Sequence, residues 1–69
     1  MLRLFGARVR RLREDRGWSQ ERLGEKASLH RNYVGCVERG ECNPALINVH
    51  KLARALGTSV WELFEGIPL

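Results

Sequence analysis

The sequence predicts an all-α domain, and three observations lead to this prediction. Apolar residues recur every three to four positions along most of the chain, and no segment alternates with the period of two that a strand would show. Gly17, Gly40 and Gly57 each follow an amphipathic segment, where a helix commonly ends. The 69 residues suffice for one domain only. We therefore expect a single compact five-helix domain that covers residues 1–69.

The first three helices are predicted to cover residues 4–16, 20–27 and 31–39. Phe5, Val9 and Leu12 place one apolar face on the first of them. Ser19 precedes the second as an N-cap residue. Gly24 lies where the second helix should pass closest to the third, and a helical glycine usually has such a reason.

The last two helices are marked mainly by their capping residues. Asn43 and Pro44 should open the fourth helix, with a capping side chain followed by proline at the first helical position. Its apolar positions keep the helical period at Leu46, Val49, Leu52, Ala53 and Leu56. Ser59 and Glu62 form the capping-box pair of a short fifth helix, whose Val60, Leu63 and Phe64 should complete the core.

Positive charge is concentrated in the first 40 residues. The chain carries a net charge of +4. Residues 1–40 hold ten Lys/Arg against five Asp/Glu, which is +5, whereas residues 41–69 hold two against three, which is −1. This distribution favours binding of a polyanion by the N-terminal part. No apolar run approaches the length of a membrane span, so we expect a cytoplasmic protein without a membrane partner.

The two cysteines predict no metal site. Cys36 and Cys42, together with His30 and His50, supply four potential zinc ligands, but no pair has the spacing of a zinc motif. We interpret both cysteines as ordinary thiols and expect no metal and no cofactor; the alternative is a role in metal binding or redox sensing.

The run from Ser19 to Gly40 predicts two short helices joined by a tight turn. Its apolar residues bury one seam between these helices and leave the outer face of the second helix free. That face carries Arg31 and Asn32, whose side chains can hydrogen-bond base edges in a major groove. A helix-turn-helix DNA-binding module is therefore the first hypothesis.

The segments SQERLGEKASLHRNYVGCVERG and NPALINVHKLARALGTSVWELF resemble the XRE-type helix-turn-helix proteins, the group of the lambdoid phage repressors and Cro. The resemblance covers about residues 5–64. It implies a compact five-helix, lambda-repressor-like domain that binds operator DNA as a symmetric dimer, with the helix-turn-helix at about 19–39 and a tail at 65–69. The chain is similar to stand-alone regulators, including the controller proteins of restriction-modification systems.

The resemblance implies a set of DNA-binding residues. The base-reading positions fall on Arg31, Asn32 and Cys36. Phosphate contacts fall on Ser19, Gln20, Arg39 and Asn43, with Tyr33 and Arg10 as further candidates. Arg13 and Glu38 match a largely buried ion pair that ties the first helix to the third in relatives. The other arginines of the first helix are expected to be solvated or to attract DNA at long range.

Several of these side chains have a second interpretation. The alternative for Asn32 is a solvated residue that only touches a phosphate. Tyr33 is either a phosphate ligand through its hydroxyl or a packing residue at the edge of the core. His30 either caps the third helix or reaches a phosphate. Cys36 either touches a thymine methyl group or gives clearance at the groove wall.

Three positions depart from the family pattern. Ser28 stands at the turn position where the family prefers glycine, and His30 replaces the usual Ser/Thr cap. Gly35 and Cys36 put small side chains where longer polar residues often read bases, which leaves fewer direct base contacts.

The C-terminal segment suggests how two copies associate. Trp61 should point away from the core, and Ile67 and Leu69 add further apolar surface. Because an exposed apolar patch on a small protein usually marks an interface, we expect a homodimer through these three residues. The alternative is a tail that folds back over its own core.

Together these observations predict a non-enzymatic transcriptional regulator of bacterial or phage origin, associated with the nucleoid, that binds a two-fold symmetric operator as a homodimer. The prediction is compatible with repression, by blocking the access of polymerase, and with activation, by direct contact with polymerase. The alternative is a protein-interaction module, an antitoxin or an adaptor, with weak non-specific DNA binding. No nucleophile is paired with a base, and 69 residues leave no room for a deep pocket, so neither catalysis nor a small-molecule ligand is expected.

Overall fold

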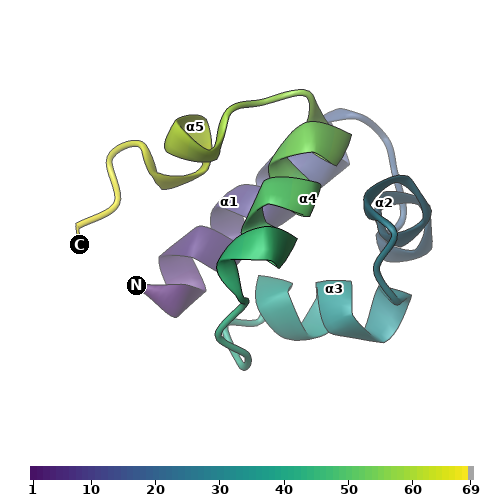
Figure 1. Ribbon diagram of the computed structural model, residues 1–69, viewed down its shortest axis with the longest axis horizontal. Helices are drawn as coiled ribbons and strands as arrows, with labels where there is room; N and C mark the ends of the chain where they lie inside the picture. Colours follow the sequence, from purple (N-terminus) through teal and green to yellow (C-terminus); the bar gives the residue numbers. More distant parts are fainter. Residues whose placement is uncertain (69) are drawn as a thin grey trace.

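A computed structural model describes residues 1–68, and all of its regular structure is helical. The helices of this part of the chain are α1 (Leu2–Asp15), α2 (Gln20–Ala27), α3 (Arg31–Glu38), α4 (Leu46–Leu56) and α5 (Val60–Phe64). They are shown in order along the chain in Figure 1. The predicted all-α fold with five helices is confirmed.

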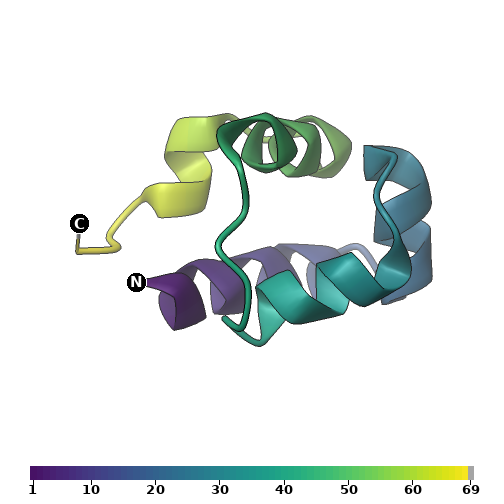
Figure 2. The same ribbon diagram turned by 60° about the horizontal axis from the view of Figure 1, so that its bottom comes forward.

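The helices are arranged in two layers. In Figure 2, α4 and α5 lie above α1 and α3, and α2 stands at one end of both layers. Helix α3 packs against α1 and α2, which leaves one side of it facing outward. Among the helices formed by residues 1–68, none has the length and apolar character that a bilayer crossing requires.

One apolar core joins all five helices. Its fully buried large side chains are Phe5, Val9, Leu23, Val34, Val37, Leu52, Leu56 and Leu63. Phe5 of α1 and Phe64 of α5 stack with ring centroids 4.9 Å apart, which attaches the short last helix to the first. Leu12, which we expected to face inward, is half-buried at the edge of this core.

The helix ends follow the predicted capping residues, with one exception. The Ser19 hydroxyl accepts the Arg22 N–H at 3.0 Å, and Ser59 with Glu62 forms the expected capping box. The predicted start of α4 at Asn43 is wrong, because α4 begins at Leu46 with Ala45 as its N-cap. The backbone carbonyl of Ala45 accepts the first helical hydrogen bonds, while the segment before it is needed to cross from α3 to α4.

The later start of α4 changes the position of its first apolar residue. Leu46 was expected on the core face, but its side chain is 77% exposed. The neighbouring Ile47 is also exposed, so the first turn of α4 presents apolar surface outward. The core begins one turn later, at Val49.

Two arginines expected to be solvated in fact hold the C-terminal part of the chain. Arg8 donates to the backbone carbonyls of Glu62 at 2.7 Å and Glu65 at 2.6 Å. Arg16 donates to the Leu56 carbonyl at 2.5 Å and so closes the end of α4. Backbone carbonyls left free at helix ends need donors, and long arginine side chains supply them here. The tail therefore starts from a fixed position on α1.

Gly6 allows α1 and α3 to approach each other closely. A Cβ atom at Gly6 would lie 2.6 Å from the backbone carbonyl oxygen of Glu38 and nearer still to that of Val37. No side chain can be accommodated without moving one helix, because both obstacles are backbone atoms. Gly6 thus fixes the distance between α1 and the last turn of α3.

We predict that Gly6→Ala lowers the free energy of unfolding by about 1–3 kcal/mol, the usual cost of overpacking. Gly35→Ala is the matched control, since its Cβ would meet only the ends of the flexible Arg39 and Gln20 side chains. The control should cost clearly less stability than Gly6→Ala, because side-chain ends can shift where backbone atoms cannot and alanine favours helix over glycine. Urea denaturation of both variants checks this, and equal stability of the two would contradict the close approach.

Candidate nucleic-acid interface

The turn between α2 and α3 is held by backbone contacts that require a small residue at Gly24. The Gly24 carbonyl accepts the Leu29 N–H at 2.8 Å. A Cβ atom at Gly24 would lie 2.5 Å from the Leu29 carbonyl oxygen, which explains the glycine. Ser28 adopts the left-handed conformation (φ 58°) that a glycine usually takes at this position. Ser28, which stands where the family prefers glycine, therefore carries backbone strain, but the turn keeps its conformation.

His30 caps helix α3. Its Nδ1 atom accepts the backbone N–H of Asn32 at 3.0 Å, the role that a Ser or Thr side chain usually performs. Of its two interpretations, the structure therefore favours the cap. This use of Nδ1 fixes the imidazole against the first turn of α3.

The outward face of α3 begins with Arg31 and Asn32, both exposed. Cys36 lies one turn further along the same face and is half-buried. The Arg31 guanidinium donates to a Glu21 carboxylate oxygen at 2.7 Å. Both side chains of this pair are 61% exposed, and an ion pair so exposed contributes only about 0–1 kcal/mol. Arg31 can therefore exchange Glu21 for a nucleic-acid acceptor at little cost.

Gly35 makes room for two side chains that come from different helices. A Cβ atom at Gly35 would lie 3.0 Å from Nη1 of Arg39 and 3.2 Å from Oε1 of Gln20. The side chains of Gln20, at the start of α2, and of Arg39, at the end of α3, thus both lie over this glycine. The absence of a side chain at Gly35 brings two of the predicted phosphate ligands together on one surface.

A buried ion pair lies beneath this surface and ties α1 to α3. Arg13 donates from Nε and Nη2 to the two Glu38 carboxylate oxygens at 2.7 Å and 3.0 Å, which is a bidentate geometry. The Glu38 side chain is only 2% exposed. The hydrogen bonding of Arg13 to the Glu38 carboxylate raises the pKa of Arg13 above its ordinary value, so the guanidinium stays charged.

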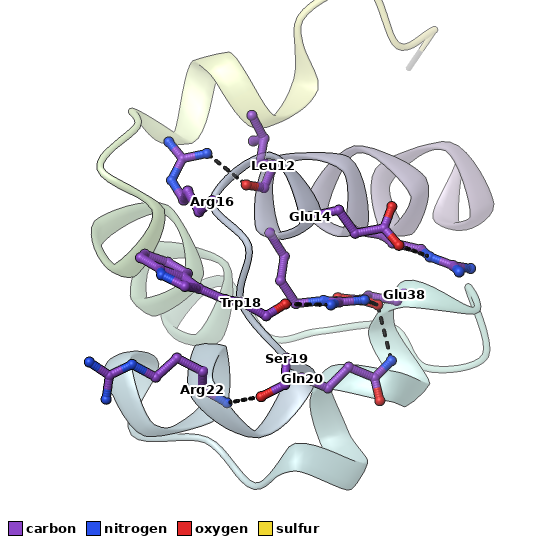
Figure 3. A network of polar contacts seen from close by, with 10 residues as sticks. Leu12, Glu14, Arg16, Trp18, Ser19, Gln20, Arg22 and Glu38 are labelled. Carbon is purple, nitrogen blue, oxygen red and sulfur yellow. Dashed lines mark hydrogen bonds and ion pairs between the residues drawn. The ribbon is translucent and has the colours of Figure 1, made fainter.

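The same ion pair also positions α2. Arg13 donates a further hydrogen bond to the Trp18 carbonyl at 2.7 Å, and Gln20 donates from Nε2 to Glu38 at 3.0 Å (Figure 3). The pair therefore holds the first turn of α2 and the last turn of α3 in a fixed relation. Burial of both charges is tolerated because each has several hydrogen-bond partners.

The remaining predicted phosphate ligands are spread around this surface. The Ser19 hydroxyl is exposed but already caps α2. The Tyr33 hydroxyl accepts from Asn48 at 3.1 Å and its ring packs at the edge of the core, which favours the packing role. Asn43 is exposed in the segment before α4, and Arg10 pairs with Glu14 on α1 at 3.2 Å.

Two features of the site were missed from the sequence. Glu21 was not recognised as the partner of Arg31, because an ion pair between residues ten apart on two helices has no periodic signature. From the sequence, Gly35 was interpreted only as the absence of a base-reading side chain. In the structure, the side chains of Gln20 and Arg39, which come from different helices, occupy the space over it. Within residues 1–68, no three His, Cys, Asp or Glu side chains gather so as to hold a metal ion.

We predict that Arg13→Met lowers the free energy of unfolding by about 3–5 kcal/mol, because it leaves the buried Glu38 carboxylate without its partner. Glu38→Leu alone should also lower the free energy of unfolding, because it leaves the buried Arg13 guanidinium without its carboxylate partner. The double variant should be more stable than the sum of the two changes predicts, since no buried charge remains. Urea denaturation of the four proteins measures this coupling, and strict additivity would contradict the importance of the pair.

The chain matches known proteins over most of its length. The helix-turn-helix domain family matches residues 4–63. The solved structure of the restriction-modification controller protein C.AhdI from Aeromonas hydrophila superposes with a TM-score of 0.89 and is 51% identical, covering 91% of this chain and 96% of that one.

Curated relatives point in the same direction. Control protein C.BamHI from Bacillus amyloliquefaciens is 40% identical over 63 residues, which are 90% of this chain and 78% of that protein. A hypothetical transcription factor of Neisseria meningitidis is 46% identical over 55 residues, 80% of this chain but only 52% of that protein. This chain thus spans about half the length of the Neisseria relative. Regulators and control proteins are DNA-binding proteins rather than enzymes, as the sequence predicted. The chain belongs to the helix-turn-helix domain family of DNA-binding regulators, and its fold is XRE-like.

Proposed function

We propose that this chain is a sequence-specific transcriptional regulator that binds a two-fold symmetric operator as a homodimer. The observation that carries the proposal is the exposed face of α3, where Arg31 and Asn32 lie beside the surface formed by Gln20 and Arg39. This combination supplies base-reading groups and phosphate ligands on one side of the domain.

Base reading is assigned to the first turn of α3. Arginine pairs bidentately with guanine O6 and N7, and asparagine pairs with adenine N6 and N7. Arg31 has its guanidinium at the surface, where only an exposed carboxylate holds it. Cys36 lies deeper and has a short side chain, so its part is contact with a thymine methyl group or clearance at the groove wall.

Phosphate binding is assigned to residues around that turn. Arg39, held by the exposed Glu41 at 3.1 Å, and Gln20 lie closest to the recognition helix. Ser19 and Asn43 flank them, and Arg10 is a more distant candidate on α1. These contacts fix the protein on the duplex, while α3 reads the sequence.

The homodimer is assigned to an apolar surface on α4 and α5. Leu46, Ile47, His50 and Val60 line a shallow hollow of about 440 Å³. Trp61, which follows Val60, is 71% exposed. A 69-residue domain buries only about 60% of its unfolded surface, so a second copy that covers this patch would add needed stability.

The structure changes the composition of the expected interface. Ile67 is half-buried and packs against the core, so it offers less surface than we expected, and Leu69 lies outside the described residues. Leu46 and Ile47 take their place in the proposed interface, because both are exposed and line the hollow with Val60. None of these residues belongs to α2 or α3. Two copies joined here would keep both recognition helices free for half-sites about 34 Å apart or somewhat closer.

We further propose that the protein is cytoplasmic and associated with the nucleoid. Its concentration would control dimer formation and, through it, occupancy of the operator. The alternative, an interaction module with weak DNA binding, drew support from the small residues Gly35 and Cys36. The side chains of Gln20 and Arg39 fill the space at Gly35, so the surface there is polar and cationic. This observation favours the DNA-binding proposal.

We predict that selection from a random pool of duplexes at physiological salt enriches a palindrome. Arg31→Ala should relax the preference at one position of each half-site, at a cost of about 1–3 kcal/mol. Arg11→Ala is the matched control, because it removes the same charge from an exposed position on α1 outside the interface. Enrichment of no sequence would support the interaction module instead.

We predict that Trp61→Ala weakens dimerisation by about 2 kcal/mol or more, as expected for a central aromatic interface residue. Ile47→Ser should weaken it as well. Leu4→Ser is the matched control, since Leu4 is an exposed apolar residue on α1 outside the hollow. Sedimentation equilibrium measures all three dissociation constants, and an unchanged Trp61→Ala dimer would contradict this interface.

A further inference from the structure

The end of α3 brings both cysteines of the chain together. Gly40 takes the left-handed conformation (φ 73°) and donates its N–H to the Val37 carbonyl at 3.0 Å. Glu41 donates its N–H to the Cys36 carbonyl, also at 3.0 Å. These two bonds are those of a Schellman motif, which reverses the chain at a helix end. Cys42 follows directly and returns to the turn of α3 that holds Cys36.

The two cysteines lie near each other at the edge of the core. Both are reduced and half-buried, and Cys42 packs against the core cluster. Burial raises the pKa of the Cys42 thiol to about 11, and the neighbouring Cys36 thiol adds to the rise. Cys42 therefore keeps its proton at neutral pH and is a poor first nucleophile.

We propose that Cys36 and Cys42 form a redox-modification site, which closes an intramolecular disulfide by exchange with a low-molecular-weight disulfide. Disulfides of proteins in reducing compartments are commonly transient and redox-sensing. The Schellman motif turns the chain back toward the turn of α3 that holds Cys36, because the Glu41 N–H bonds to the Cys36 carbonyl. This reversal shortens the movement that bond formation requires.

The exchange has two steps. Cys36 loses its proton, and its thiolate attacks one sulfur of glutathione disulfide; the S–S bond breaks and glutathione leaves as a thiolate. Cys42 then loses its proton and attacks the Cys36 sulfur of the mixed disulfide, and the second glutathione thiolate leaves. Two protein thiols are thus oxidised to one disulfide, one glutathione disulfide is reduced, and the two protons end on two glutathione thiols.

The effect on DNA binding rests on the proposed function. A disulfide holds its sulfur atoms about 2.05 Å apart, far closer than two free thiols can approach. Closing the bond draws Cys36 away from the outward face of α3 and draws residue 42 toward α3. Arg39 and Asn43, two of the proposed phosphate ligands, flank this segment on both sides. The oxidised protein should therefore bind its operator more weakly than the reduced protein.

The first readout is independent of DNA. The purified full chain is incubated with glutathione disulfide, and its mass is measured before and after reduction. The wild type should lose two hydrogens and keep no glutathione, whereas Cys42→Ser should stop at one glutathione adduct. Two adducts on the wild type, a disulfide between two chains or no reaction would each overturn the site.

The second readout is the affinity for the selected duplex. Oxidation should weaken binding by the wild type by about tenfold, the change expected when one charge-assisted hydrogen bond is lost. The Cys36→Ser/Cys42→Ser variant should bind equally with and without the oxidant. A disulfide that forms without changing the affinity would overturn the regulatory effect. Failure of the reduced protein to bind any duplex would overturn the proposed function while leaving the mass result intact.

Discussion

The ion pair between Arg13 and Glu38 is the interaction on which the geometry of this domain depends. It joins α1 to the last turn of α3 through two hydrogen bonds, and it reaches α2 through the Trp18 carbonyl and Gln20. A hydrophobic contact at this point would hold the helices together without fixing their angle, because apolar packing is not directional. The bidentate pair supplies that direction, and Gly6 sets the distance at which it can form. The orientation of α3 relative to α1 follows from these two constraints.

The domain also carries exposed ion pairs, whose arginine side chains can exchange their carboxylate partners for other acceptors. Arg31, Arg39 and Arg10 each hold an exposed carboxylate, at distances of 2.7–3.2 Å. Such pairs contribute little to stability because water and salt screen them, so a phosphate or a base edge can replace the carboxylate. Buried and exposed ion pairs thus have different tasks in this protein. The buried pair fixes the fold, and the exposed pairs leave their arginine side chains at the surface, as the proposed DNA binding requires.

The sequence predicted those features that repeat along the chain or that lie close together in it. Helical periodicity and local capping identified α2, the Ser59 cap and the buried face of α3. The start of α4 was misplaced, because Asn43 and Pro44 satisfy the same local rules in a connecting segment as at a helix start. Contacts between distant residues carry no such pattern. The bonds from Arg8 to the tail and the filling of the space at Gly35 therefore emerged only from the structure.

The most direct test of α3 as the DNA-reading helix is a titration of the isotope-labelled protein with its selected duplex. NMR spectra record the chemical shifts of the backbone amides at each step of the titration. The largest shifts should lie at the start of α2, along residues 31–36 and in the segment 39–43. Signals of the exposed apolar patch around Ile47 and Trp61 should stay unchanged when the protein is already dimeric. Shifts confined to α4 and α5, with α3 unaffected, would contradict the assignment of α3 as the recognition helix.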